Sequence, residues 1–381
     1  MTNTLTAIGH ILSPINAIAA LCARAHLETR FGRAVRLHLA YYNPSDDSEL
    51  VEGMYTVIEA MLTRFDNITL SRLDTVDGDA AHIIASLGAS LNVRQADFIL
   101  YAHDVVTPWP QSLAKAYPTA KTVCYGDALG QFFTRHDLPV SSPHGGHLGR
   151  LWRYLRGPKA KAPQAAPVFL PKILAAILPV AQKPLPASVQ LMVPDKDSVA
   201  TTLHLCALSC VDLQNYCTAL ATEFGSDATL FLTENMAEGQ FISFDDEMRF
   251  YTDTILRNCA PGSTIIIKPH ADETQARIFA FREMLGGVFT IKQIDKKYAR
   301  YPVELFLPLL QKCSVIGMYY PVLSLKYLYD IDVIQPLDAR TIEKYFPRAV
   351  WASYKTAILL NMQPLAQLGG WNGISLLYNG K

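Results

Sequence analysis

An apolar run of three isoleucines, Ile265 to Ile267, ends directly in Lys268, Pro269 and His270. A β-branched run without polar alternation is typical of a strand buried on both faces of a parallel sheet. Ligands of open α/β sheets bind beyond the carboxyl ends of the strands, where this run would place a cation and an imidazole. Lysine supplies a fixed charge and histidine a charge or a proton, so the turn suits a phosphate-bearing ligand. An ordinary strand end followed by a turn is the alternative.

The N-terminal half alternates short apolar runs with helix-like segments. Strands are predicted over residues 5–11, 35–41, 68–73, 98–101 and 122–125, and helices over residues 16–30, 47–64 and 79–92. Ser13 is a suitable N-cap for the first helix, with Pro14 at its first helical position. This β-α-β rhythm predicts a doubly wound, mostly parallel sheet.

A second α/β segment follows. Its predicted strands are residues 228–232, 263–267, 314–318 and 333–334, and its predicted helices are 245–259, 275–285, 303–313, 323–329 and the segment from 341 onward. Between the halves, residues 157–187 hold seven prolines among alanines and lysines, a composition typical of a linker. We therefore expect domains at 1–156 and 188–345 on either side of this linker, with C-terminal helices at 346–381 that pack back on the first domain.

This organisation fits an α/β, GT-B-like architecture, in which two Rossmann-like domains face a central cleft and the C-terminus is helical. In that architecture the first domain binds an acceptor and the second a nucleotide donor, but a fold alone does not assign a reaction.

Composition narrows the function classes. The chain has 381 residues, half of them hydrophobic, with 34 basic and 34 acidic residues, so bulk charge gives no support for binding nucleic acid. Its seven cysteines form no CxxC pair, which favours reduced thiols in a cytosol over zinc ligands. We see no signal peptide and no apolar stretch of about 18 residues, and expect a cytoplasmic protein. The basic segment 150–172 either contacts the inner membrane peripherally or is a solvated linker.

Other polar residues follow predicted strands. Asp127, in the segment Gly126–Gly130, either takes a proton from an attacking hydroxyl or caps the next turn. Ser324, in the turn that includes Tyr320, either completes an anion site at a helix N-terminus or merely caps that helix. Glu304 either accepts ribose hydroxyls or complements a helix dipole.

Three further positions are placed by topology. Thr233 and Glu234 follow a strand of the second half and are expected near a nucleotide. His103 ends a strand of the first half, where it either contacts a sugar or is an ordinary surface histidine.

These residues resemble a known family. Lys268-Pro269-His270 resembles the Lys-Pro-His or Lys-Gly-His element of bacterial sialyltransferases and polysialyltransferases, and Gly126-Asp127 with Gly130 is similar to their acid-acid-glycine element, which carries the catalytic base. Ser324 stands where their serine pair binds the donor phosphate, and Glu304 matches their ribose-binding acid in order. Ser13-Pro14, after the first predicted strand, is similar to their N-terminal loop. The chain departs from the family in lacking one acid beside Asp127, in having alanine after His270, and in having a single serine at 324.

The resemblance implies an inverting glycosyltransferase that uses a CMP-activated sugar. Asp127 would deprotonate the acceptor hydroxyl, and His270 would assist the departing CMP phosphate, with Lys268 and Ser324 stabilising its charge. The residues implied to bind the donor are Lys268, Pro269, Ser324, Glu304, Thr233, Glu234 and Tyr320. Those implied to bind the acceptor are Ser13, Asn16 and His103. No cofactor and no metal are expected.

The implied sugar is sialic acid or a related nonulosonate, namely Kdo, pseudaminic acid or legionaminic acid. The implied acceptor is an oligosaccharide, glycolipid or polysaccharide of capsule or lipopolysaccharide. Two alternatives stay open: a polyol-phosphate transferase of the CDP-glycerol type, and a non-catalytic glycan-binding protein with a degenerate GT-B site.

Overall fold

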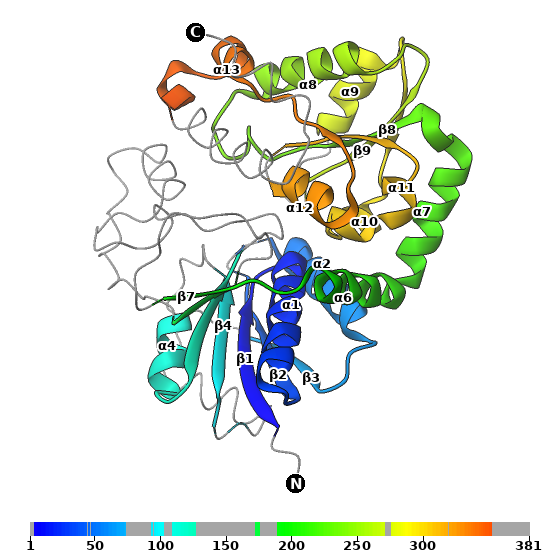
Figure 1. The fold of residues 1–381 in the computed structure, drawn as a ribbon. Coiled ribbons are helices and arrows are strands. Elements are labelled where there is room, and N and C mark those ends of the chain that lie inside the picture. The colour runs from blue at the N-terminus through cyan, green and yellow to red at the C-terminus, as the bar shows by residue number, and fades with distance from the viewer. Residues whose placement is uncertain are drawn as a thin grey trace. The chain divides into compact units, whose positions relative to one another are not determined.

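A computed structural model describes residues 4–43, 45, 47–73, 93, 95–102, 109–126, 172–175, 189–270, 276–318 and 320–352. These residues form two compact units. Those up to Val211 belong to the first unit and those from Asp212 onward to the second. Each unit is built around a parallel sheet of its own (Figure 1).

The first unit contains a seven-stranded sheet in the order β3-β2-β1-β4-β5-β6-β7, in which every neighbouring pair is parallel. The chain therefore leaves β1 in one direction to form β2 and β3, then crosses back to β4. Ligands of doubly wound folds bind at this reversal between β1 and β4. The strands are β1 (Leu5–Ile11), β2 (Val35–Tyr41), β3 (Ile68–Arg72), β4 (Phe98–Ala102), β5 (Lys121–Tyr125), β6 (Ile173–Ala175) and β7 (Gln190–Met192).

The described helices of this unit are α1 (Pro14–Phe31), α2 (Ser48–Leu62), α4 (Trp109–Ala116) and α6 (Lys196–Ser209). The predicted start of α1 is confirmed: Ser13 accepts a hydrogen bond from the backbone N–H of Asn16, and Pro14 is the first helical residue. Gly32 ends α1 with φ of 59°, a left-handed conformation in which glycine carries no steric penalty.

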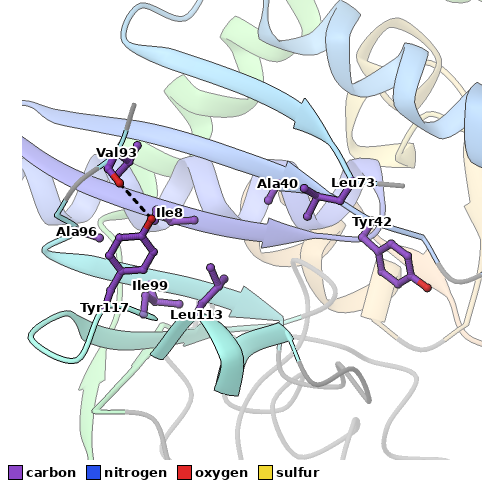
Figure 2. Close-up of a cluster of buried hydrophobic side chains, with 9 residues drawn as sticks. All are labelled: Ile8, Ala40, Tyr42, Leu73, Val93, Ala96, Ile99, Leu113 and Tyr117. Atoms are coloured by element: carbon purple, nitrogen blue, oxygen red, sulfur yellow. Dashed lines mark hydrogen bonds between the residues drawn. The ribbon is translucent and has the colours of Figure 1, made fainter. Parts of the chain in front are cut away.

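An apolar cluster packs between the sheet and α4 (Figure 2). Ile8 of β1 and Ile99 of β4 are fully buried and adjacent in register, and Leu113 of α4 covers them. Burying each such side chain stabilises the fold by about 1.5–3 kcal/mol. Tyr117 closes the cluster, because its ring is buried while its hydroxyl donates to the carbonyl of Val93 at 3.3 Å.

The second unit contains a five-stranded parallel sheet in the order β10-β9-β8-β11-β12, the same winding as in the first unit. Its strands are β8 (Ala228–Leu232), β9 (Thr264–Lys268), β10 (Thr290–Gln293), β11 (Ser314–Ile316) and β12 (Val333–Ile334). Its helical segments are α7 (Val211–Phe224), η1 (Gly225–Asp227), α8 (Phe244–Asn258), α9 (Ala276–Leu285), α10 (Lys296–Ala299), η2 (Val303–Leu305), α11 (Leu307–Leu310), α12 (Tyr320–Tyr329), α13 (Ala339–Tyr345) and η3 (Arg348–Val350). The isoleucine run of β9 is buried on both faces, as its sequence predicts.

Two Rossmann-like α/β units in succession make the fold GT-B-like, in agreement with the sequence prediction. Within the described residues no helix is both long enough and apolar enough to cross a membrane.

The first sheet includes β7 at residues 190–192, although sequence analysis placed the start of the second domain at residue 188. Residues 173–175, inside the predicted linker, form β6, and β7 pairs with β6. Both strands have only three residues, and the proline-rich surroundings hide them from pattern analysis. Backbone hydrogen bonds between β5, β6 and β7 determine how these strands pair, and the sequence alone does not reveal those bonds.

Two helix predictions in the second unit were wrong in extent. The helix predicted over residues 303–313 is split into η2 and α11 at Phe306, because Pro308 has no N–H to continue a helix from residue 304. The helix predicted to begin at Leu323 begins at Tyr320. This second difference changes the environment of Ser324.

Candidate functional site

Lys268 is the last residue of β9, at the carboxyl edge of the second sheet. Its ammonium donates to the carbonyl of Ala299 at 2.9 Å and lies 5.5 Å from the ring centre of Phe306. The side chain is half-buried. Lys268 thus places a cation at the carboxyl edge of the second sheet, the edge at which ligands of open α/β sheets bind.

Glu304 and Ser324 meet beside this lysine. The Ser324 hydroxyl donates to Oε1 of Glu304 at 2.6 Å, and the two residues are 1% and 4% exposed, respectively. The Tyr329 hydroxyl donates to the Glu304 carbonyl at 2.9 Å, which ties η2 to α12 a second time. Burial raises the pKa of Glu304, and the Ser324 hydrogen bond and the charge of Lys268 oppose that rise. Lys268, Glu304 and Ser324 therefore interact electrostatically as one group.

Ser324 does not lie at a helix N-terminus. Because α12 starts at Tyr320, Ser324 is in the second turn, and its hydroxyl also reaches the carbonyl of Pro321 at 3.1 Å. The prediction of an anion site made from amide groups around Ser324 is corrected accordingly. Tyr320, which the sequence analysis placed in this site, is half-buried at the first position of α12.

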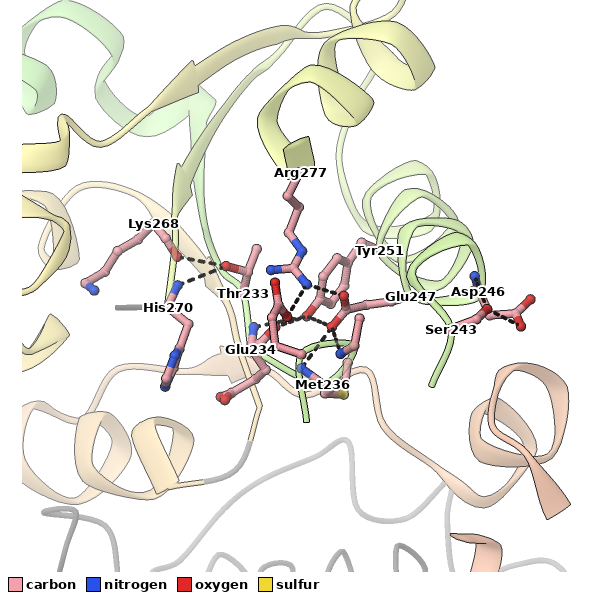
Figure 3. A network of polar contacts seen from close by, with 12 residues as sticks. Thr233, Glu234, Met236, Ser243, Asp246, Glu247, Tyr251, Lys268, His270 and Arg277 are labelled. Carbon is pink, nitrogen blue, oxygen red and sulfur yellow. Dashed lines mark hydrogen bonds and ion pairs between the residues drawn. The ribbon is translucent and has the colours of Figure 1, made fainter. Parts of the chain in front are cut away.

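Thr233 joins the loops that follow β8 and β9. Its N–H and its hydroxyl donate to the carbonyl of Lys268 at 3.2 and 3.4 Å, and its hydroxyl oxygen accepts the N–H of His270 at 3.3 Å. Pro269, between Lys268 and His270 in the sequence, is buried. The His270 side chain is partly exposed (Figure 3). The position of Thr233 beside Lys268 and His270 follows from the parallel pairing of β8 with β9.

A buried polar network lies directly behind this edge (Figure 3). Glu247 of α8 is completely buried and pairs with Arg277 of α9, which is 2% exposed and also pairs with Glu238 at 2.9 Å. Burial raises the pKa of Glu247, and Arg277 opposes that rise. Tyr251 joins the network, because its hydroxyl lies 3.2 Å from Oε1 of Glu247.

Sequence analysis missed this network. The acidic residues at the start of α8 include Asp246, which forms the N-terminal cap of the helix with Ser243. The available signal was the spacing of Glu247 and Tyr251, since residues four apart share a helix face, and the neighbouring Met248 and Ile255 are apolar.

In the first unit, Ser13 and Asn16 lie at the carboxyl end of β1. The side-chain oxygen of Asn16 accepts the N–H of Leu12 at 3.1 Å, and Ser13 caps α1. Both side chains thus bind the main chain of their own turn, and their predicted role in acceptor binding stays a prediction. Gly126 is buried directly after β5, while Asp127 and His103 lie outside the described residues. Among the described residues, no group of three His, Cys, Asp or Glu side chains is arranged to hold a metal ion.

No protein-family model matches the chain, and no curated protein matches it. Solved structures with a similar fold include UDP-GlcNAc 2-epimerase from Neisseria meningitidis bound to UDP-GlcNAc, with a TM-score of 0.48 and 13% identity over 96% of this chain and 91% of that one. The GT-B domain of a sialyltransferase from Photobacterium damselae gives 0.46 and 10% over 93% and 96%. A glycosyltransferase from Rickettsia africae gives 0.43 and 10% over the whole of both chains. Likenesses of this strength assign no reaction, which has to be inferred from the side chains.

Proposed function

We propose that this protein is an inverting glycosyltransferase that moves sialic acid or a related nonulosonate from its CMP-activated form to a hydroxyl of a surface glycan. The observation that carries the proposal is the grouping of Lys268 with the buried Glu304–Ser324 pair at the carboxyl edge of a Rossmann-like sheet. A cation, a hydroxyl and a carboxylate together match the groups of a nucleoside monophosphate, which offers one phosphate and a ribose diol.

Lys268 and His270 suit the phosphate. The ammonium of Lys268 now donates to a neutral carbonyl, and a phosphate oxygen would give it a stronger, charge-assisted hydrogen bond. His270 follows two residues later, with its N–H fixed by Thr233. From that position its imidazole would donate to, or protonate, a departing phosphate.

Glu304 suits the ribose. A buried carboxylate needs hydrogen-bond donors, and in the free protein it takes one from Ser324. Ribose hydroxyls would supply replacements and release the Ser324 hydroxyl to donate to the phosphate. The nucleobase of the donor, by contrast, has no pair of adjacent hydroxyl groups to donate to this carboxylate.

The chemistry also requires a proton acceptor. Asp127 would take the proton of the acceptor hydroxyl as its oxygen forms a bond to the anomeric carbon on the face opposite CMP. The bond between that carbon and the phosphate oxygen breaks, and its electron pair leaves with CMP. Lys268, Ser324 and His270 would stabilise the charge that develops there. Acceptors of this kind are tethered to membranes, which is why we also propose a cytoplasmic protein with peripheral membrane contact.

Release of CMP from CMP-sialic acid and CMP-Kdo tests the proposal, with wild type compared with His270→Ala and Asp127→Asn. We expect release by wild type and its loss in both variants, while CMP binding, measured by calorimetry, is kept in Asp127→Asn. A product that retains phosphate from a CDP-polyol would favour the polyol-phosphate transferase instead. A protein that binds neither CMP nor a CMP-sugar would contradict the proposal.

A further inference from the structure

The first residues of the loop after β8 are held by side chains of α8. Oε1 of Glu247 accepts the N–H of Met236 at 3.1 Å and the N–H of Ala237 at 3.3 Å. The Tyr251 hydroxyl accepts the N–H of Glu234 at 3.0 Å and lies 3.0 Å from the carbonyl oxygen of the same residue. Two side chains, one helical turn apart, therefore bind the peptide groups of three loop residues.

The charge of this arrangement is balanced from a second helix. Glu247 is completely buried, and a buried carboxylate is costly unless it is paired and hydrogen-bonded. Arg277 of α9 supplies the pair, and it also binds Glu238, which belongs to the loop itself. The loop is thus attached to α8 through amide groups and to α9 through a carboxylate (Figure 3).

The held residues adjoin the candidate site. Thr233 immediately precedes Glu234, and its hydroxyl oxygen accepts the N–H of His270 while its own N–H and hydroxyl donate to the carbonyl of Lys268. Thr233 and its hydrogen bonds would therefore transmit a displacement of the Glu234 peptide to the Lys268–His270 turn. Hydrogen-bonded chains of this kind align groups that do not themselves touch the ligand.

We propose that Glu247, Tyr251 and Arg277 are positioning residues of the donor site, which hold residues 234–238 so that Thr233 fixes the Lys268–His270 turn. The ligand named here, CMP, rests on the function proposed above. Glu247 contacts both Tyr251 and Arg277, and each of the three contacts the loop. Thr233, which precedes the loop, contacts the turn.

Tyr251→Phe is the sharpest test, because it removes one hydroxyl and keeps the ring that packs edge-on against Phe231 at 5.3 Å between centroids. Tyr345→Phe is the matched control. Its hydroxyl donates to the Asp253 side chain, which belongs to the same helix, α8. Each variant loses one tyrosine hydroxyl, which belongs to α8 in Tyr251 and binds α8 in Tyr345. A general loss of stability would therefore affect the two variants alike.

We expect the Kd for CMP and the donor KM to rise about three- to ten-fold in Tyr251→Phe, with a smaller change in kcat and no change in Tyr345→Phe. We also expect faster hydrogen exchange at the amide of Glu234 and at its neighbours Met236 and Ala237 in Tyr251→Phe, measured without ligand, because the Tyr251 hydroxyl accepts the Glu234 N–H. Equal CMP affinity in the two variants, or unchanged exchange at these amides, would overturn the inference. A wild-type protein that binds no CMP would overturn the proposed function, while the exchange rates would still decide whether Tyr251 holds the loop.

Discussion

The hydroxyl of Ser324 donates to the buried carboxylate of Glu304 at 2.6 Å, across 20 residues of sequence. The family resemblance assigns these two residues to different parts of a donor, one to its phosphate and one to its ribose. In the free protein these two side chains bind each other. Their hydrogen bond satisfies both the buried carboxylate of Glu304 and the buried hydroxyl of Ser324. A ligand that binds here would therefore replace the hydrogen bond between Ser324 and Glu304. It would not simply add hydrogen bonds to groups that have none.

Ser324→Ala is expected to destabilise the protein by about 1–3 kcal/mol at neutral pH, because it leaves the Glu304 carboxylate with one donor fewer. The pKa of Glu304, already raised by burial, should rise further, since the Ser324 hydrogen bond opposes that rise. A folded-state pKa above the unfolded value means that stability is lost as pH rises through the folded pKa, so the deficit should shrink in acid. Chemical denaturation at several pH values measures it, with Ser314→Ala, exposed on β11, as the control. A deficit that does not depend on pH would contradict this account.

Lys268→Met should weaken CMP binding about ten-fold or more, because it removes a half-buried charge and keeps most of the apolar stem. The remaining affinity should depend less on salt than that of wild type. Calorimetry at two salt concentrations gives both values. Lys312→Met removes an exposed lysine of the same unit, and equal losses in the two variants would show that Lys268 acts only through net charge.

Arg277→Met is expected to cost about 3–5 kcal/mol, because it leaves Glu247 as an uncompensated buried charge. Without the opposing guanidinium, the pKa of Glu247 should rise further, and protonation should restore part of the stability as the pH is lowered. Denaturant titrations at neutral and acid pH check both effects. Arg282→Met, on the exposed side of the same helix, should change stability by less than about 0.5 kcal/mol.

Asp253→Asn should weaken the attachment of α13 to α8. Hydrogen bonds from Lys344 and Tyr345 lower the pKa of Asp253, so its stabilisation is present above the unfolded pKa and is lost as pH falls through the folded one. The group is partly exposed, so we expect a loss of at most about 1 kcal/mol at neutral pH. Thermal melts of the variant and wild type should converge in acid. Asp66→Asn, at an exposed site in the first unit, should show no such convergence.

Local pattern was sufficient to find most of the described strands. The residues of β1, β2 and β8 are those predicted, because most positions of these strands are buried and most of their residues are apolar. It was insufficient for β6, β7 and β10, which have three, three and four residues. The break at Phe306 was within reach of the sequence, since Pro308 is visible in it.

The sequence by itself determined most of the strands and helices and their order along the chain, the capped start of α1, and the arrival of Lys268 and His270 at the end of a buried strand. These properties follow from short-range sterics, helix capping and the burial of apolar runs. Only the tertiary structure decided that Ser324 meets Glu304 and that Arg277 neutralises Glu247. Such pairs depend on how helices pack over a sheet, where a buried charge is tolerated only if residues distant in sequence supply its partners.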